Sequence, residues 1–427
     1  MPSSKTSVVC TAYKLRDNAS PQQIRFNTGT DLAVKAHGLL GPRGISRRAA
    51  DLVDIAASIF QIERQLRGRQ RTNPVARFEL TIRVREATAW NERATSSLID
   101  ILNVLGNPTW NVRVDPGLQS QIPQHEKSKD QNIEQVALFS GGLDSACGAL
   151  TLRKQKAITQ LTSYYTGQKS LQADLAKAFG FSPPVQWSLH WAKEPGRGHS
   201  YFYRSFLFLA LGAAVAESWG ARRLFQFENG VLASAIPPAP SFAMTHHAHP
   251  RLHAACSRLF GLLFGGTWSV SNPFLPCTKR ECVERAVSGS KVDDVHGLLL
   301  RTQTCWFFSA NRMLGAKKQP HRACGVCIPC LLRRTAMPDD DYVYDLTKDS
   351  NRNSHAKGAA FRSYYGFLSR TLSCPDEREF YRVLPAAGRD VVATGAMQLA
   401  DLYKLFRRFA MEFMDTYGIT PESDASA

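Results

Sequence analysis

The sequence contains no hydrophobic run long enough to cross a membrane. Its most apolar stretch, Phe206 to Ala216, falls well short of the ~18 residues that a spanning helix requires, and it indicates a buried helix instead. The opening residues, MPSSKTSVVC, lack the apolar run of a secretory signal. Internal repeats and low-complexity segments are also lacking. With no signal and no membrane segment predicted, we expect a cytoplasmic globular protein.

Acidic residues are too few to balance the basic ones, which gives the 427-residue chain a formal net charge of +17. This excess favours an acidic partner, such as a nucleotide, a nucleic acid or an acidic protein surface. Part of it gathers in one stretch with Arg64, Arg67, Arg69, Arg71 and Arg77, followed by Arg83 and Arg85 on one face of an expected strand. The cluster fits a solvated basic face and a docking surface equally well.

Hydrophobic patterning divides the chain into regions of different class. We expect an N-terminal α+β accessory domain over residues 1–113, with strands in TSVVCTAYKL and at Arg77–Arg85 and a helix at Ala49–Leu66. The polar residues 114–134 are typical of a linker. A nucleotide-binding domain over 135–300, a cysteine segment over 301–337 and a helical region over 338–427 follow. The last region has expected helices at Phe361–Thr371, Glu377–Leu384 and Met397–Tyr417.

Strand and helix patterns alternate through residues 135–300. The expected strands are Gln135–Phe139, Ile158–Tyr165, Val185–Leu189, Arg223–Phe227 and Trp268–Val270. The expected helices are Asp144–Arg153, Leu171–Phe179, Tyr201–Trp219, Pro250–Leu263 and Lys279–Val287. This alternation predicts an α/β fold with a doubly wound parallel sheet.

A glycine-containing motif follows the first of these strands. The apolar run Val136–Phe139 is typical of a strand buried on both faces, and it leads into Ser140-Gly141-Gly142-Leu143-Asp144-Ser145 and then a helix. Adjacent glycines allow close approach to a ligand, and N–H groups at a helix start suit phosphate or pyrophosphate. The serine hydroxyls can add hydrogen bonds, and Asp144 can hold Mg²⁺. Because Gly-x-x-x-x-Gly-Lys-Ser/Thr is missing, γ-phosphate transfer is not indicated.

Cys324, Cys327 and Cys330 crowd into seven residues, and Cys305 is the natural fourth member of the group. Four thiolates with no open coordination position predict a structural Zn²⁺ site. An iron–sulfur cluster with the same ligands is the alternative. A disulfide framework is not expected, since the cytosol keeps thiols reduced.

Together these motifs resemble the PP-loop ATP pyrophosphatases, and among them the 7-cyano-7-deazaguanine synthase family. The resemblance covers residues 135–337. It rests on the SGGLDS motif, Thr-x-Thr-Cys at 302–305 and Cys-x-x-Cys-x-x-Cys-x-x-Arg ending at Arg333. Further matches are Tyr165–Lys169 with the family's Tyr-Gly-Gln segment, Arg204-Ser205 with its Arg-Asn or Arg-Ser pair, and Asn272-Pro273-Phe274 and Lys279 with its Thr-Pro-Leu…Lys segment. The resemblance implies a PP-loop fold of the HUP type that binds ATP and Mg²⁺ along Phe139–Ser145.

The same resemblance implies a reaction and roles for single residues. ATP would activate the carboxylate of 7-carboxy-7-deazaguanine as an acyl adenylate, with release of pyrophosphate. Lys279 and Lys169 would face the phosphates beside Asp144, and the substrate would contact Tyr165, Gln168, Arg204 and Asn229. Glu228, expected just past a strand, is our predicted base for the second step, with a helix cap or an ion pair as the other interpretation. We expect His246, His247 and His249 to form a polar loop near the substrate rather than a metal site.

The chain departs from the synthase family in several places. Phe227–Leu232 replaces the family's Tyr-Pro-Asp-Cys-Arg stretch, and Asn311–Arg322 lengthens the spacing from Cys305 to the other cysteines. The added terminal regions resemble the larger synthase-like proteins of bacterial antiphage operons, including the Qat type. Such relatives attach the deazaguanine acyl group to the amino terminus of a partner protein. We therefore expect an ATP-dependent C–N ligase whose acceptor is a protein from the same operon.

Other functions stay open at this point. Synthesis of the free nitrile for queuosine-type modification would need ammonia as the acceptor. A PP-loop enzyme that modifies tRNA or DNA would account for the net charge of +17, although nucleic acid is not the favoured partner. A nucleotide-sensing scaffold without catalysis is the remaining alternative. No membrane partner is expected.

Overall fold

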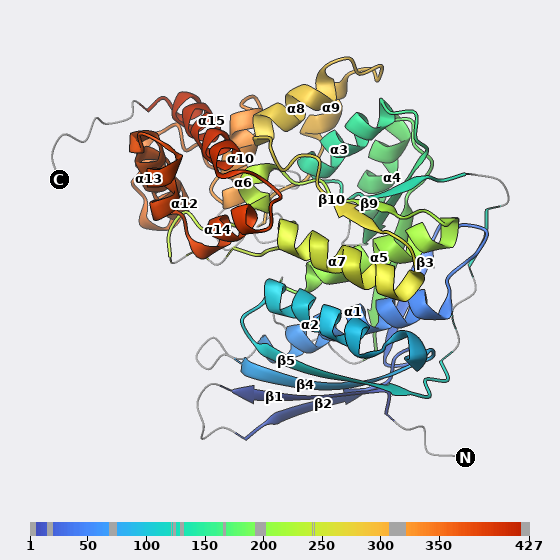
Figure 1. Ribbon diagram of the computed structural model, residues 1–427. Helices are drawn as coiled ribbons and strands as arrows, with labels where there is room; N and C mark the ends of the chain where they lie inside the picture. Colours follow the sequence, from blue (N-terminus) through green and yellow to red (C-terminus); the bar gives the residue numbers. More distant parts are fainter. Residues whose placement is uncertain are drawn as a thin grey trace.

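The computed structural model describes residues 6–14, 20–67, 75–120, 122, 125–128, 132–164, 168–192, 202–240, 242, 244–306 and 322–419. Predictions for Arg69, Arg71, Tyr165 and the segment 311–321 lie outside these residues. The described chain forms two β-sheets in layers with helices, and further helices pack at one end (Figure 1). None of its described helices is both long and apolar enough to span a membrane.

The first sheet lies at the N-terminal end and has helices on one face. Its strands are β1 (Val8–Lys14), β2 (Gln22–Phe26), β4 (Val75–Val84) and β5 (Thr109–Pro116), in the order β2-β1-β4-β5. Alternate residues of β4 (Phe78, Leu80 and Ile82) are buried under the helices, whereas Arg77 points to the open face. The covering elements are α1 (Arg47–Arg67), η1 (Ala87–Ala89) and α2 (Glu92–Leu105).

The arginine cluster divides between two environments. Arg77 is exposed, and its guanidinium lies 4.4 Å from the centre of the Tyr13 ring. Arg85 instead lies just beyond β4, where its Nη1 is 2.9 Å from Asp51 Oδ1 and 2.8 Å from Asp54 Oδ2. The prediction that Arg83 and Arg85 share one solvated strand face is therefore wrong for Arg85. Its buried ion pairs leave it unsuited to docking an acidic partner.

The second sheet is central and contains five parallel strands with one antiparallel strand at its edge. The order is β10 (Ser269–Ser271), β9 (Arg223–Phe225), β6 (Gln135–Leu138), β7 (Thr159–Tyr164), β8 (Val185–Trp191) and β3 (Leu32–His37). The five strands that were predicted to be parallel are parallel, in the order β10, β9, β6, β7 and β8. The prediction of an all-parallel sheet is wrong at the edge, because β3 is antiparallel to β8. This strand comes from the N-terminal region. An antiparallel edge strand needs no crossover helix, so a distant segment can supply it.

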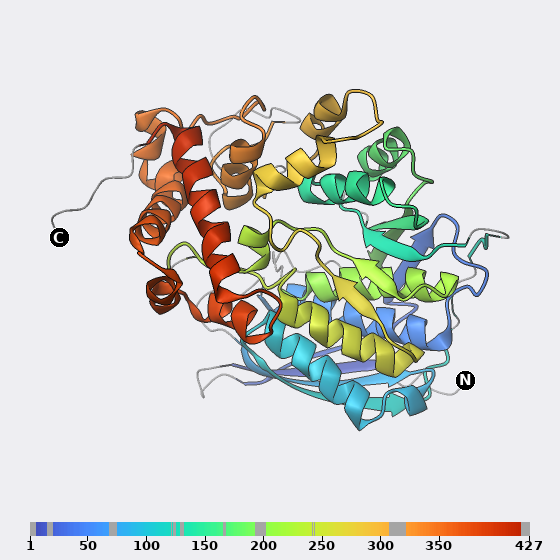
Figure 2. The same cartoon turned by 45° about the horizontal axis from the view of Figure 1, so that its top comes forward.

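Helices cover both faces of the central sheet (Figures 1 and 2). One face carries α5 (Arg204–Trp219) and α7 (Pro250–Phe264), which pack in turn on α1 and α2. Their apolar side chains form one continuous core with the N-terminal sheet. The other face carries α3 (Leu143–Arg153), α4 (Lys169–Ala178), α8 (Lys279–Val287) and α9 (Val295–Leu300). The molecule is thus an α/β protein in which the N-terminal region shares its core with the central sheet.

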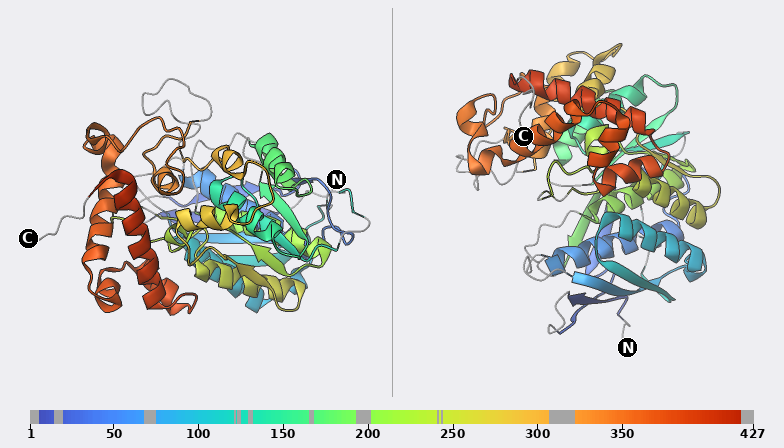
Figure 3. Two further views of the ribbon diagram at one scale, coloured as in Figure 1. Left: turned by 90° about the horizontal axis from the view of Figure 1, so that it is seen from above. Right: turned by 60° about the vertical axis from the view of Figure 1, so that its left-hand side comes forward.

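The C-terminal helices form a separate aromatic core at one end of the central sheet (Figure 3). They are α10 (Ile328–Ala336), α11 (Asp349–Arg352), α12 (His355–Ser373), α13 (Glu377–Val383), α14 (Ala386–Ala393) and α15 (Leu399–Tyr417). Phe361 stacks on Phe413 between α12 and α15, with ring centres 5.3 Å apart. The short α6 (Gly230–Ala233), which follows β9, also packs into this core. The C-terminal region therefore supports the segment after β9.

Candidate functional site

Ser140–Ser145, here called the glycine loop, joins β6 to α3. Gly141 has a φ of +80°, a backbone conformation that favours glycine, and Gly142 is the N-cap of α3. The Ser140 and Ser145 hydroxyls lie 3.1 Å apart, and Ser140 Oγ also accepts a hydrogen bond from the Gly142 N–H (3.2 Å). Helix α3 thus begins with polar groups grouped around its N-terminus, an arrangement that suits an anionic ligand.

The glycine loop lies where the strand order reverses. Strands β6 and β9 are neighbours in the sheet although β7 and β8 separate them in sequence. In open α/β sheets, ligands bind in the crevice at the carboxyl ends of the two strands on either side of such a reversal. Glu228 and Asn229 lie three and four residues beyond β9, and Asn229 contacts Asp144 of the glycine loop.

Asp144 and Lys279 form a buried ion pair near the carboxyl ends of β6 and β9. Lys279 is the first residue of α8, and its Nζ donates to Asp144 Oδ2. The Lys279 side chain is fully buried and that of Asp144 is 8% exposed. Burial raises the pKa of Asp144, but the Lys279 ammonium outweighs it and holds that pKa below its ordinary value. Burial lowers the pKa of Lys279, but the Asp144 carboxylate raises it above its ordinary value. Both groups are therefore charged.

Asn229 fixes the geometry around this pair. Its Nδ2 donates to Asp144 Oδ1 (3.2 Å) and to Glu228 Oε1 (2.8 Å), while its Oδ1 accepts from the Leu232 N–H (3.2 Å). Its backbone N–H also lies 3.3 Å from Asp144 Oδ1. Since the amide is fully buried and uses both of its ends, its orientation is fixed. The predicted residues Asp144, Lys279, Glu228 and Asn229 therefore form one hydrogen-bonded group.

Glu228 has a histidine partner that the sequence did not indicate. His247 Nε2 lies 2.8 Å from Glu228 Oε2. The backbone of Glu228 is held on both sides by Asn272, whose Oδ1 accepts from its N–H (3.2 Å) and whose Nδ2 donates to its carbonyl (2.7 Å). Burial and the charge of Asp144 raise the pKa of Glu228, against the hydrogen bond from His247. The result is a carboxylate–imidazole pair beside the buried ion pair.

Among His246, His247 and His249, His247 alone has a described hydrogen bond to the group of residues around Asp144, and its partner there is Glu228. His249 is the N-cap of α7, where its Nδ1 accepts from the Arg251 N–H (3.2 Å), and the ring of His246 packs edge-on against it. Within the described chain these histidines do not form a metal-binding group. The expectation of a polar loop near the substrate stays a prediction. No sequence motif marks His247, because it lies 19 residues beyond Glu228 on a separate segment.

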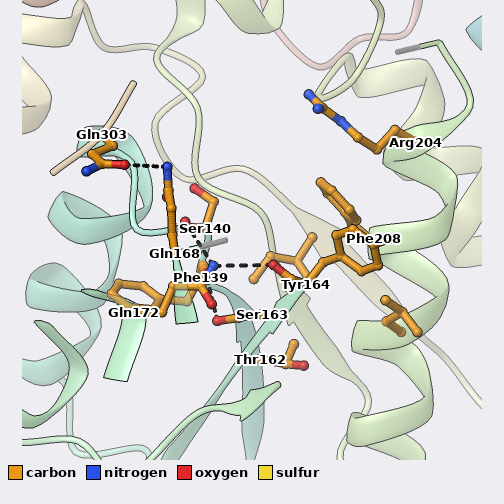
Figure 4. A pocket seen from close by; sticks show the side chains of 12 residues that line it. Phe139, Ser140, Thr162, Ser163, Tyr164, Gln168, Gln172, Arg204, Phe208 and Gln303 are labelled. Atoms are coloured by element: carbon orange, nitrogen blue, oxygen red, sulfur yellow. Dashed lines mark hydrogen bonds between the residues drawn. The ribbon is translucent and has the colours of Figure 1, made fainter. Parts of the chain in front are cut away.

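A cavity of about 200 Å³ opens beside the glycine loop (Figure 4). Its lining residues are Leu138, Phe139, Ser140, Thr162, Ser163, Tyr164, Gln168, Gln172, Arg204, Phe208, Leu211 and Gln303. On one side Gln168 Nε2 donates to Gln303 Oε1 (2.6 Å), and on the other side Arg204 and Phe208 project from α5. The Arg204 guanidinium lies 5.6 Å from the centre of the Phe208 ring. The cavity thus combines flat aromatic surface with amide and guanidinium groups.

The residues predicted to lie near the substrate and the phosphates are found in different environments. Gln168 and Arg204 line the cavity, and their contact with the substrate stays a prediction. Lys169, in contrast, is exposed at the first residue of α4, and the contact described for it is a backbone one, from Gln186 Nε2 to its carbonyl (2.9 Å). Its prediction as a phosphate-facing lysine stays a prediction. Tyr165 lies outside the described residues.

Cys305, Cys324, Cys327 and Cys330, here called the cysteine cluster, meet at the base of α10. Their sulfur atoms all lie within 4.8 Å of one another. Cys324 and Cys330 are 3.8 Å apart, and Cys305 and Cys327 are 4.0 Å apart. In a tetrahedral Zn²⁺ site with Zn–S bonds of ~2.3 Å, the sulfurs are separated by about 3.8 Å. The four side chains therefore fit one metal ion, as the sequence predicted.

Backbone groups complete the surroundings of the cysteine cluster. The Cys324 N–H donates to Cys305 Sγ (3.3 Å), and the N–H groups of Val326 and Cys327 donate to Cys324 Sγ (3.4 and 3.3 Å). Hydrogen bonds to sulfur stabilise the thiolate form and orient metal ligands. The donor set is made only of sulfur, which suits Zn²⁺ and also an iron–sulfur cluster.

The C-terminal helix α15 reaches the residue that precedes Lys279. Thr278 caps α8, and its hydroxyl donates to Glu412 Oε1 (2.7 Å). Burial raises the pKa of Glu412 to about 7, despite the hydrogen bond from Thr278 and the charge of Arg280. Its second oxygen is buried without a hydrogen-bond partner within the described chain. A proton on Glu412 therefore favours the docking of α15 against α8.

The stability of the protein should fall as this proton is lost. The raised pKa means that the native state holds the proton more tightly than the unfolded chain, so the stabilisation is complete below about pH 4.5 and lost as pH rises through about 7. We expect Glu412→Gln to raise the free energy of unfolding at pH 8 by about 1 kcal/mol relative to its effect at pH 5. Urea denaturation at both pH values, with the exposed Glu92→Gln as a matched control, measures this. A parallel pH dependence in both variants would contradict it.

The described residues therefore contain a buried ion pair beside a Glu–His pair, a cavity next to the glycine loop, and a cysteine cluster that could bind metal. Comparison of the chain with known proteins found no family model that matches it and no curated protein that matches its sequence.

Proposed function

We propose that the chain is an ATP-dependent acyl-adenylating ligase with a PP-loop fold. Its substrate is 7-carboxy-7-deazaguanine, and its acceptor is an amine, the amino terminus of a partner protein in an antiphage defence system. The observation that carries the proposal is the buried Asp144–Lys279 pair at the glycine loop. A fixed cation at a helix N-terminus stabilises negative charge on a leaving pyrophosphate.

In the first half-reaction, a carboxylate oxygen of the substrate attacks the α-phosphorus of ATP. The bond from that phosphorus to the bridging oxygen breaks, and pyrophosphate leaves with the electron pair. The glycine loop would hold the β- and γ-phosphates through its N–H and hydroxyl groups. Lys279 would face the oxygen on which charge develops, and its burial strengthens this interaction because water does not screen it.

The cavity beside the glycine loop supports binding of a nucleobase there. Its volume of about 200 Å³, the ring of Phe208 and the amides of Gln168 and Gln303 suit a flat, polar-edged heterocycle. It adjoins Ser140, so a 7-carboxy-7-deazaguanine held by Gln168 and Arg204 would lie next to ATP phosphates on the glycine loop. The reversal of strand order between β6 and β9 supports the binding of phosphates at the glycine loop itself.

In the second half-reaction, the amine nitrogen attacks the acyl carbon and AMP leaves. The amine must lose a proton, and the Glu228–His247 pair would accept it. The raised pKa of Glu228 favours this role, because a group with a pKa closer to neutrality is a better proton acceptor at neutral pH. The helix-cap alternative for Glu228 is not supported, since Asn229 caps α6. The ion-pair alternative has His247 as the partner of Glu228 at 2.8 Å, and we propose that this same pair accepts the proton.

Two metal ions would accompany this chemistry. Mg²⁺ bound with ATP neutralises phosphate charge, and the Asp144 carboxylate is the group in the glycine loop that would hold it. Zn²⁺ in the cysteine cluster would be structural, since four thiolates leave no open coordination position. The chain's own residues therefore carry the proton transfer and the orientation of the reactants.

Incubation with ATP, Mg²⁺ and 7-carboxy-7-deazaguanine tests the proposal. We expect pyrophosphate release that depends on the carboxylate substrate, followed by a mass increase on a protein encoded next to this chain. Release of free 7-cyano-7-deazaguanine with ammonia alone would assign nitrile synthesis instead. Failure to release pyrophosphate with this substrate would overturn the adenylation itself.

A further inference from the structure

The segment Thr302–Cys305, here called the strap, lies directly on the glycine loop. The Gln303 N–H donates to the Gly141 carbonyl (3.0 Å). Thr304 Oγ1 accepts a hydrogen bond from the Leu143 N–H (3.3 Å), which is at the first position of α3. The strap therefore pairs with backbone groups on both sides of the loop's turn.

The strap also limits the shape of the loop and the cavity. A Cβ on Gly142 would lie 3.4 Å from the Gln303 carbonyl oxygen, so the loop packs closely under the strap. The Gln303 side chain forms part of the cavity wall and accepts a hydrogen bond from Gln168 (2.6 Å). A displaced strap would thus change both the anion-binding loop and the neighbouring cavity.

At its other end the strap belongs to the cysteine cluster. Cys305 is both the last residue of the strap and one of the four sulfur ligands. Arg333 of α10 reinforces this end, because its Nη1 donates to Thr302 Oγ1 (2.7 Å) and approaches Thr304 Oγ1 (3.3 Å). The Arg333 guanidinium is buried and also pairs with Asp340 at 2.5 Å. Helix α10 carries Cys330, so the cluster and the arginine hold the strap from the same helix.

We propose that metal binding by the cysteine cluster sets the shape of the glycine loop through the strap, with Gln303 and Thr304 as the positioning residues. The proposal rests on the proposed binding of ATP at that loop. With metal bound, Cys305 is fixed and Thr304 holds the Leu143 N–H. Without metal, Cys305 loses the bond to the ion and keeps weaker contacts such as the hydrogen bond from the Cys324 N–H, so the strap is held less firmly. Nucleotide affinity therefore follows metal content although the ion does not touch the nucleotide.

The variant Thr304→Val tests the contact between the strap and the glycine loop without changing the metal ligands. This variant removes the acceptor for the Leu143 N–H but leaves the four sulfurs in place. We expect it to retain one Zn²⁺ per chain by elemental analysis and to bind α,β-methylene-ATP with Mg²⁺ about five- to tenfold more weakly by calorimetry. Amide hydrogen exchange of residues 139–146 should become faster. Thr151→Val, also on α3 but bonded only within that helix to the Cys147 carbonyl in the contacts described, is the matched control.

Removal of the metal provides the second comparison. Cys305→Ser should lower the zinc content and produce the same faster exchange at residues 139–146, whereas Cys374→Ser, outside the cluster, should change neither. Wild-type-like nucleotide affinity and exchange in Thr304→Val and Cys305→Ser would overturn the proposal. If wild-type protein itself binds no nucleotide, the proposed function fails, and the zinc-dependent exchange still decides whether the strap couples the two sites.

Discussion

Replacing Lys279 with methionine is expected to lower the rate of pyrophosphate release by about 10²–10³-fold. Methionine has a similar length but no charge, so it fills the buried space without stabilising the leaving group. The substrate carboxylate and ATP can still bind, which means that the loss should appear in kcat more than in KM. Single-turnover measurements with saturating ATP would show this directly. Lys177→Met, an exposed position on α4, is the matched control.

The same substitution should also destabilise the protein, and this effect can be separated from catalysis. Removing Lys279 leaves Asp144 buried without its counter-ion, which costs about 3–5 kcal/mol for a pair of this kind. Adding Asp144→Asn removes the orphaned charge, so the double variant should recover much of the lost stability in urea denaturation. It should not recover pyrophosphate release. Recovery of activity together with stability would show that the pair is structural and would contradict its catalytic role.

Glu228→Gln is expected to separate the two half-reactions. The amide cannot accept a proton, so acyl transfer to the amine should slow by about 10²–10⁴-fold. Formation of the acyl adenylate does not need this base, so exchange of labelled pyrophosphate into ATP should stay within a few-fold of wild type. Glutamine can still hydrogen-bond to Asn229 and His247, which preserves the local structure. Glu92→Gln is the matched control.

His247→Gln tests whether the pair acts as a unit. If Glu228 and His247 share one function, the double variant should be no slower in acyl transfer than the slower single variant, because effects of residues that act together are not additive.

Equal losses of pyrophosphate exchange and acyl transfer in Glu228→Gln would contradict its assignment to the second step. Such a result would indicate that Glu228 instead maintains the environment of Asp144.

The parts of the structure that local sequence determines were predictable. Helix α8 has the predicted bounds Lys279–Val287, because Thr278 and Glu281 form a capping box at its start. The glycine loop was recognisable because an apolar strand, two glycines and a helix follow one another in sequence. The cysteine cluster was recognisable from its spacing, and the structure brings Cys305 to the other three sulfurs.

Features that depend on tertiary contacts were not predictable in the same way. His247 reaches Glu228 only because the C-terminal helices and α7 position the intervening segment, and nothing in the local sequence encodes that contact. Helix α2 is an exception, because local signals encode it and our sequence analysis overlooked them: its apolar residues recur at helical spacing, and Asn91 caps its start. The contact of Thr304 with Leu143 spans 161 positions of the chain, a distance at which periodicity carries no signal.

The edge strand β3 has a consequence for how the protein is made. His37 of β3 is hydrogen-bonded to Ser188 of β8, 151 residues further along the chain (3.0 Å). During synthesis, β3 therefore leaves the ribosome long before β8 has been made, and it stays unpaired until then. An unpaired strand is a template for aggregation, and charged side chains on it reduce this hazard. Lys35 and the polar His37 interrupt the apolar pattern of β3. Such residues lower the tendency of an unpaired strand to aggregate before β8 has been synthesised.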